Sequence, residues 1–172
     1  AEDSDAVVPL LKRLLFSARS PQSAKRAGLS LARHALARHA PEEARVYMQV
    51  ALEAAPDDVE TQLALADVES AAGYPHRAAD ILEAALRTVP SGRVDASVRM
   101  TLTLAELCIE RLAEVGRARR VLWRAVDLPD LADSDVLALG KAALEAADVA
   151  LTLRFTDRLE PTSPVAVRGL CL

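Results

Sequence analysis

An internal repeat with a period of 34 residues constrains the fold more than any other feature of the sequence. When residues 25–58 are aligned with residues 59–92, nine positions are identical, and all are alanine, leucine or proline. The identical pairs are Leu29 and Leu63, Leu31 and Leu65, Ala32 and Ala66, Ala37 and Ala71, Pro41 and Pro75, Ala44 and Ala78, Ala51 and Ala85, Leu52 and Leu86, and Pro56 and Pro90. Such a period is typical of short helical units that stack, because no single unit can bury its apolar face alone.

The composition favours helices over strands. Apolar residues make up 51% of the chain, but only 3% of the residues are aromatic. Alanine, leucine, arginine and glutamate are common here, and all four are good helix formers. A large β-sandwich core would need more aromatic and β-branched residues. The composition therefore predicts an all-α protein.

The second window, residues 59–92, shows the plan of one unit most clearly. Apolar residues run through its first half as far as Gly73, which can adopt a positive φ and so end a helix. Pro75 favours the start of a second helix, because proline is well tolerated in a first turn. Pro90 ends that second helix. We therefore expect each unit to be two antiparallel helices joined by a tight turn.

This order of residues resembles the tetratricopeptide repeat (TPR) family, most clearly over residues 25–92 and in degenerate form over 93–161. The matching positions are Leu31, Ala32, Ala44, Met48, Ala51 and Pro56 in the first window, and Leu65, Ala66, Gly73, Tyr74, Ala78, Leu82, Ala85 and Pro90 in the second. His39 stands where the family has its turn glycine. The resemblance implies an all-α, right-handed α-solenoid of antiparallel helix hairpins, in which we expect about nine helices.

We interpret residues 1–172 as a single TPR-like domain. Its expected parts are an unpaired or capping helix (5–20), repeat 1 (25–58), repeat 2 (59–92), a longer repeat 3 (93–130), a degenerate repeat 4 (131–161), and a tail or the start of a further helix (162–172). Because the pattern starts and stops within a repeat, and because alanine, arginine and leucine dominate, we interpret the chain as a segment of a larger bacterial protein.

For the irregular repeats 3 and 4, the sequence predicts where helices begin, break and end. In repeat 3 the first helix is expected to span about residues 94–113, with Gly116 breaking it. In repeat 4 we expect Asp133 or Ser134 to cap the first helix. The second helix of repeat 4 is expected to run to Leu159.

No arrangement of residues in the sequence predicts catalysis, a metal site or a cofactor. His34 and His39 are five residues apart, whereas two metal ligands on one helix face are typically four apart. The six glycines are scattered and form no phosphate-binding loop. Cys108 lies in an apolar stretch and is expected to be buried. We therefore expect a protein that is not an enzyme and that binds no metal and no cofactor.

Charge is distributed along the sequence in bands. Residues 9–40 contain seven basic residues and no acidic one, and residues 42–69 contain eight acidic residues and one arginine. Four arginines follow within residues 117–124, and residues 127–148 then hold six acidic residues and one lysine. Two interpretations stay open: a solvated surface that keeps the units soluble, or complementarity to a partner with bands of opposite sign.

The resemblance implies that the first helix of each repeat lines a concave face on which a partner binds. Binding on the convex face remains an alternative. The candidate partner-binding residues are Arg26, Leu29, Arg33, Ala37, Glu60, Leu63, Asp67, Ser70, Val94, Ser97 and Thr101. We expect these side chains to be exposed. The predicted function is that of a non-catalytic protein-interaction module that binds a peptide, a helix or a folded partner.

Two other functions stay open. The first is a self-associating scaffold or a regulatory segment of a multidomain machine, with homo-oligomers formed through exposed terminal helices. The second is an RNA-binding helical repeat, but the net charge of −4 and the few aromatic residues argue against nucleic acid. No stretch is long and apolar enough to predict a membrane span. Isolated Cys108 and Cys171 favour the cytoplasm, with a periplasmic or secreted location still open.

Overall fold

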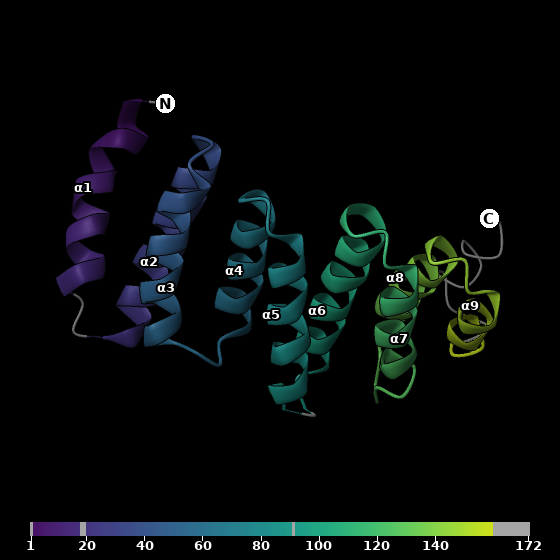
Figure 1. The fold of residues 1–172 in the computed structure, drawn as a ribbon. Helices are drawn as coiled ribbons and strands as arrows, with labels where there is room; N and C mark the ends of the chain where they lie inside the picture. The colour runs from purple at the N-terminus through teal and green to yellow at the C-terminus, as the bar shows by residue number, and fades with distance from the viewer. Residues whose placement is uncertain (1, 18–19, 91, 160–172) are drawn as a thin grey trace. The chain divides into compact units, whose positions relative to one another are not determined.

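The computed structural model describes residues 2–17, 20–90 and 92–159. These residues form nine α-helices and one short π-helix, and no strand (Figure 1). The α-helices are α1 (Glu2–Ser17), α2 (Pro21–Ala37), α3 (Pro41–Ala54), α4 (Val59–Ala71), α5 (Pro75–Thr88), α6 (Val94–Glu106), α7 (Val115–Ala125), α8 (Asp133–Glu145) and α9 (Val149–Thr156), and the π-helix η1 is Leu107–Arg111. The all-α class is confirmed. The expected tail at 162–172 and the end of repeat 4 after residue 159 lie outside the described residues.

The chain divides into two compact units, Ala1–Thr88 and Val89–Leu172. In the first unit α2 packs on α3 and α4 packs on α5, and α2 and α4 also contact each other. The second unit repeats this plan, with α6 on α7, α8 on α9, and contacts between α6 and α8. Antiparallel helix hairpins therefore pack in series within each unit, in the manner of a helical solenoid, as expected. The single domain and its repeat boundaries stay predictions.

Each hairpin turns at one residue with a left-handed backbone. These residues are His39 (φ 56°), Gly73 (φ 87°), Ala113 (φ 54°) and Ala147 (φ 52°). After Gly73, the amide of Tyr74 donates to the carbonyl of Glu69 at 2.9 Å, which is the hydrogen bond of a Schellman cap. The amides of Ala40 and Asp148 make the equivalent bonds to carbonyls five residues earlier. Three of the four hairpins thus share this hydrogen bond, although only one of them has glycine at the turn. After Ala113, the amide of Glu114 instead donates to the carbonyl of Cys108, six residues earlier, at 2.8 Å.

The structure corrects the expected break in repeat 3. Gly116 lies inside α7 and does not break a helix. The first helix of this hairpin instead continues from α6 into η1, whose wider turns accommodate extra residues in a helix. The chain then turns at Ala113. The π-helix therefore accommodates some of the extra residues of repeat 3.

Repeat 4 also differs from the expectation at both of its helices. The first helix begins at Asp133, with Ala132 in the N-cap position and no side-chain cap, so neither Asp133 nor Ser134 caps it. The second helix ends at Thr156 and does not reach Leu159. Asp148 caps this second helix by accepting a hydrogen bond from the amide of Leu151 at 3.0 Å. The side-chain cap of this hairpin therefore lies at the start of α9, and not at the start of α8 as expected.

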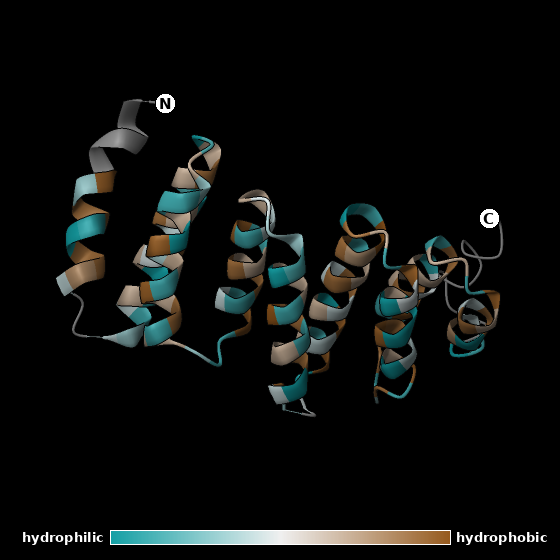
Figure 2. Cartoon of the chain, viewed as in Figure 1, coloured by the Kyte–Doolittle hydropathy of each residue, from teal (hydrophilic) through white to brown (hydrophobic). Residues whose placement is uncertain are grey.

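Small residues set the spacing of the helices in the first unit. Figure 2 shows hydrophobic and hydrophilic positions alternating around the helices, as amphipathic packing requires. A Cβ added to Gly28 of α2 would lie 2.6 Å from the Cβ of Ala51 and 2.9 Å from the carbonyl oxygen of Tyr47, both on α3. Glycine at this position therefore lets the two helices approach more closely than any other residue would allow.

Candidate partner-binding surface

Two neighbouring helices of the first unit, α2 and α4, carry stripes of exposed residues with the same spacing. The stripe of α2 contains Arg26, Ser30, Arg33 and Ala37, and the stripe of α4 contains Glu60, Ala64, Asp67 and Ala71. Steps of four, three and four residues keep each stripe on one helix face. All eight residues are exposed except Ala64, which is half-buried. Because α2 packs beside α4 and the stripes are related by the 34-residue repeat, we treat them together as the α2–α4 surface.

The candidate residues from the sequence divide into three groups. Five of them belong to the α2–α4 surface: Arg26, Arg33, Ala37, Glu60 and Asp67. Ser70 of α4, and Val94 and Ser97 of α6 in the second unit, are half-buried. Leu29, Leu63 and Thr101 are buried, with exposed fractions of 4%, 8% and 3%.

The expectation that all eleven side chains are exposed is therefore wrong for Leu29, Leu63 and Thr101. Leu29 belongs to the apolar core of the first unit, together with Leu65 and Val68 of α4. Sequence reasoning also missed Ser30, Ala64 and Ala71. The signal that could have found them is the spacing of small and polar residues, which repeats after 34 positions in both helices.

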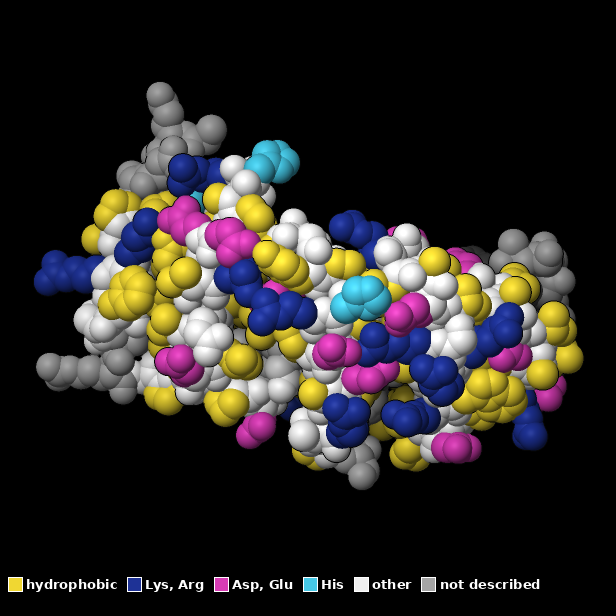
Figure 3. Space-filling view, viewed as in Figure 1, with side chains coloured by type: hydrophobic (Ala, Val, Ile, Leu, Met, Phe, Trp, Pro, Cys, Tyr) yellow, Lys and Arg dark blue, Asp and Glu magenta, His cyan; other side chains and the backbone are white. Residues whose placement is uncertain are grey.

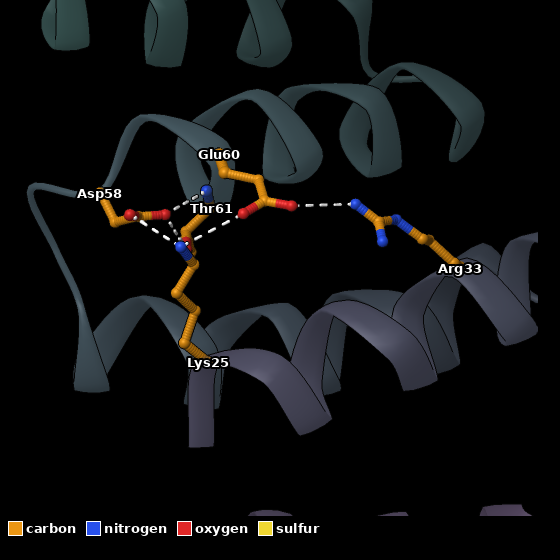
Figure 4. Close-up of polar contacts among 5 residues, drawn as sticks. All are labelled: Lys25, Arg33, Asp58, Glu60 and Thr61. Carbon is orange, nitrogen blue, oxygen red and sulfur yellow. Dashed lines mark hydrogen bonds and ion pairs between the residues drawn. The ribbon is translucent and has the colours of Figure 1, made fainter. Parts of the chain in front are cut away.

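A network of charged side chains ties α2 to α4 (Figure 4). The Nζ of Lys25 lies 2.9 Å from Oδ1 of Asp58 and 3.2 Å from Oε2 of Glu60. The guanidinium of Arg33 donates to the other oxygen of Glu60 at 3.1 Å. Asp58 also accepts hydrogen bonds from the amide and the hydroxyl of Thr61, both at 2.9 Å, and so caps α4. Both Arg33 and Glu60 are thus already engaged within the protein.

The contacts of the network favour the charged forms of Lys25, Asp58 and Glu60. The hydrogen bond to Asp58 raises the pKa of Lys25 above its ordinary value, against the opposing effect of burial, and the bond to Glu60 adds to it. The hydrogen bond from Lys25 lowers the pKa of Glu60. Burial alone would raise the pKa of Asp58, but the hydrogen bonds from Lys25 and Thr61 outweigh it, and the pKa is lowered.

Asp67 differs from the other acidic residues of this surface. Its side chain is exposed, yet the surrounding protein partly removes it from water, and this desolvation raises its pKa. Among the described residues, its carboxylate makes no hydrogen bond and no ion pair. Arg26, at the opposite end of the surface, is exposed and has no ion-pair partner among the described residues either. The surface therefore presents one uncompensated charge of each sign.

The charge bands of the sequence pair with each other inside the first unit. Besides the network of Lys25 and Arg33, Lys12 of α1 lies 3.1 Å from Glu43 of α3. Within the acidic band itself, its one arginine, Arg45 of α3, lies 3.0 Å from Glu69 of α4. Figure 3 shows basic and acidic side chains next to one another on the visible face of α3 and α5. Neither interpretation of the bands anticipated that successive helices would satisfy one another.

The arginine cluster of the second unit is used partly for structure. Arg119 of α7 donates to the carbonyl oxygens of Ala146 and Ala147 at 2.8 and 2.9 Å, where α8 ends. Trp123 of α7 donates from its indole nitrogen to Asp148 at 3.1 Å. Arg120 and Arg124 are exposed. The cluster is therefore less available to a partner than its sequence suggests.

The described part of the chain offers no group of three histidine, cysteine or acidic residues that could hold a metal ion. Cys108 is fully buried, as expected. In the second unit an apolar groove with a volume of about 180 Å³ lies between α8 and α9, lined in part by Val136, Leu144 and Thr152. None of the helices within the described ranges is long and apolar enough to cross a membrane.

Comparison with known proteins supports the fold. No protein-family model and no curated protein matches the sequence. Among solved structures, the chain is similar to that of PilF from Pseudomonas aeruginosa, with a TM-score of 0.57 and 14% sequence identity. The match covers 98% of this chain and 77% of the PilF chain. This similarity shows a TPR-like helical-repeat fold, in agreement with the resemblance seen in the sequence.

Proposed function

We propose that the chain is a non-catalytic protein-interaction module that binds a peptide, a helix or a folded partner along the α2–α4 surface. The observation that carries this proposal is the pair of matched exposed stripes on two adjacent helices. A TPR-like fold supports it, because stacked helical repeats create extended binding surfaces.

The chemistry of the α2–α4 surface suits a protein ligand. Ser30, Ala37, Ala64 and Ala71 have short side chains, which leave room for the side chains of a partner. The same surface contains the ion pair between Arg33 and Glu60, at 3.1 Å. Polar groups that are already held in place cost less entropy to order on binding. A partner would thus meet small residues, a fixed ion pair, and one open charge of each sign.

Blocking the surface tests the proposal. The double variant Ala37→Arg/Ala71→Arg places two long side chains on the surface, near the C-terminal ends of α2 and α4, where positive charge is compatible with the helix dipole. The control Ala84→Arg makes the same change at an exposed alanine of α5. Peptides selected from a random display library against the wild-type full chain would serve as ligands, with dissociation constants measured by fluorescence anisotropy.

We expect the double variant to bind the selected peptides at least about tenfold more weakly than the wild type, which corresponds to about 1.4 kcal/mol. The control should bind them like the wild type. If no peptide is selected, or if the double variant binds as well as the control, the proposal is wrong.

Self-association is the second candidate, and exposed apolar side chains favour it. Leu10 and Phe16 of α1 are 67% and 65% exposed, and Leu144 of α8 and Val149 of α9 are 60% and 66% exposed. Exposed apolar side chains that cluster are typical of contact sites between proteins. Sedimentation velocity at two concentrations tests this function: an unchanged monomer at both concentrations argues against it.

A further inference from the structure

Asp67 is placed where it can select the charge of a bound partner. It lies on α4 seven residues after Glu60, and therefore about 10 Å further along the helix. In the repeat alignment its counterpart on α2 is Arg33, but the guanidinium of Arg33 is bound to Glu60 at 3.1 Å. The basic residue that could have compensated Asp67 is thus committed elsewhere.

The surroundings of Asp67 leave it open to an incoming group. Ala64 and Ala71 of the α4 stripe and Ala37 of the α2 stripe are small, and the long side chain of Arg33 is bound to Glu60. Desolvation is the only cause that raises the pKa of Asp67, so no neighbouring charge stabilises its ionised form. A cation that reaches this carboxylate would gain an ion pair and would displace no other cation of the described residues.

A basic side chain fits Asp67 better than a metal ion does. Divalent cations need several oxygen ligands, and Glu60, the nearest acidic residue of the stripe, is held by Lys25 and Arg33. A single carboxylate among small residues is a suitable partner for one ammonium or guanidinium group.

We propose that Asp67 is the specificity-determining residue of the α2–α4 surface, and that it selects partner segments with a lysine or arginine side chain. This inference rests on the proposed function. The partner is a protein segment with a basic residue that ion-pairs with the Asp67 carboxylate.

The test is a double-mutant cycle on the full chain. A display library with equal numbers of acidic and basic residues would be selected against the wild type, and against Asp67→Asn and Asp67→Lys. The control Asp57→Asn removes an exposed carboxylate of the same unit that lies in the turn between α3 and α4. For the best wild-type peptide, each basic residue would be replaced by glutamine in turn, and the dissociation constants measured with the wild type and each variant.

We expect peptides selected by the wild type and by Asp57→Asn to be enriched in lysine or arginine, and peptides selected by Asp67→Lys to be enriched in acidic residues. Replacing one basic residue of the peptide should weaken wild-type binding about tenfold and leave binding to Asp67→Asn nearly unchanged.

Two different results would overturn the inference. If peptides bind and Ala37→Arg/Ala71→Arg blocks them, but Asp67 shows no coupling to any basic residue, the surface binds peptides and Asp67 does not select them. If no peptide binds, or if the blocked variant binds like the wild type, the proposed function fails and this inference fails with it.

Discussion

The two units hold their hairpins together by different means. In the first unit, side-chain ion pairs join neighbouring helices, as between Lys25 of α2 and Asp58 and Glu60 of the next hairpin. In the second unit, Arg119 joins α7 to the end of α8 by hydrogen bonds to two backbone carbonyls. The same plan of stacked hairpins is thus compatible with quite different polar contacts, because the apolar core and the turns carry the repeat.

Glycines in the two units show a second difference. Gly28 of α2 has no room for a side chain, because an added Cβ would meet atoms of α3 at 2.6 and 2.9 Å. At Gly140 of α8, an added Cβ would lie 3.5 Å from the Cβ of Phe155 on α9, which is an ordinary contact. Glycine in the first helix of a hairpin is therefore required by close packing in one unit and not in the other.

The largest expected effect comes from replacing these glycines. Gly28→Ala should lower the free energy of unfolding by about 2 kcal/mol, because the clashing atoms belong to Ala51 and to the backbone of Tyr47 and cannot move aside. Gly140→Ala should be neutral or stabilise by up to about 1 kcal/mol, since alanine is the better helix former. Urea unfolding followed by far-ultraviolet circular dichroism measures both changes. Equal effects of the two substitutions would refute the difference in packing.

The second prediction concerns the polar contacts. Lys25→Met should destabilise by about 1–2 kcal/mol, because it leaves Asp58 and Glu60 without their shared cation. Arg119→Met should cost about 1 kcal/mol through the loss of two hydrogen bonds to backbone carbonyls. The measurement is again urea unfolding, repeated across a range of pH.

The two variants should respond differently to pH. The pKa values of Asp58 and Glu60 are lowered, so their contribution is present above the unfolded pKa, near pH 4, and is lost as the pH falls through the folded pKa. The pKa of Lys25 is raised, so its contribution is present below the unfolded pKa, near pH 10.5, and is lost as the pH rises through the folded value.

The cost of Lys25→Met should therefore be constant between about pH 5 and pH 10 and shrink on both sides. The cost of Arg119→Met should not shrink in acid, because its acceptors are backbone carbonyls, which do not titrate. If the destabilisation caused by Lys25→Met and by Arg119→Met changes with pH in the same way, the polar contacts of the two units do not differ in kind.

Much of the fold could be predicted from the sequence, because the repeat and the turn residues are local signals. Gly73 and Pro75 mark the turn and the start of α5, and Pro41 marks the start of α3. The exposed face of α4 could not be predicted as well. Apolar residues occupy most of the circumference of this helix, so the pattern did not separate Leu63, which faces the core, from Asp67, which is exposed as expected.

The pairing of charges could not be predicted either, because it depends on which helix faces meet. The sequence shows a basic band and an acidic band, but only the packing of α2 beside α4 brings Lys25 to Asp58, 33 residues away. The widening of the helix at Leu107–Arg111 has no local signal of its own, since these residues are all compatible with an α-helix.

The smallest expected effect comes from the turn residues. Ala147 holds a left-handed backbone at φ 52°, which costs a residue with a side chain about 1 kcal/mol. Ala147→Gly should remove this cost, but glycine also gains freedom in the unfolded chain, so the net stabilisation should be about 0.5 kcal/mol. Gly73→Ala is the converse change: no atom lies within 4 Å of an added Cβ, so its cost of about 1 kcal/mol would come from the backbone alone. If Ala147→Gly raises the midpoint of thermal unfolding and Gly73→Ala lowers it, both units depend on one turn geometry. If both substitutions shift the midpoint in the same direction, the turns of the two units differ, as their polar contacts do.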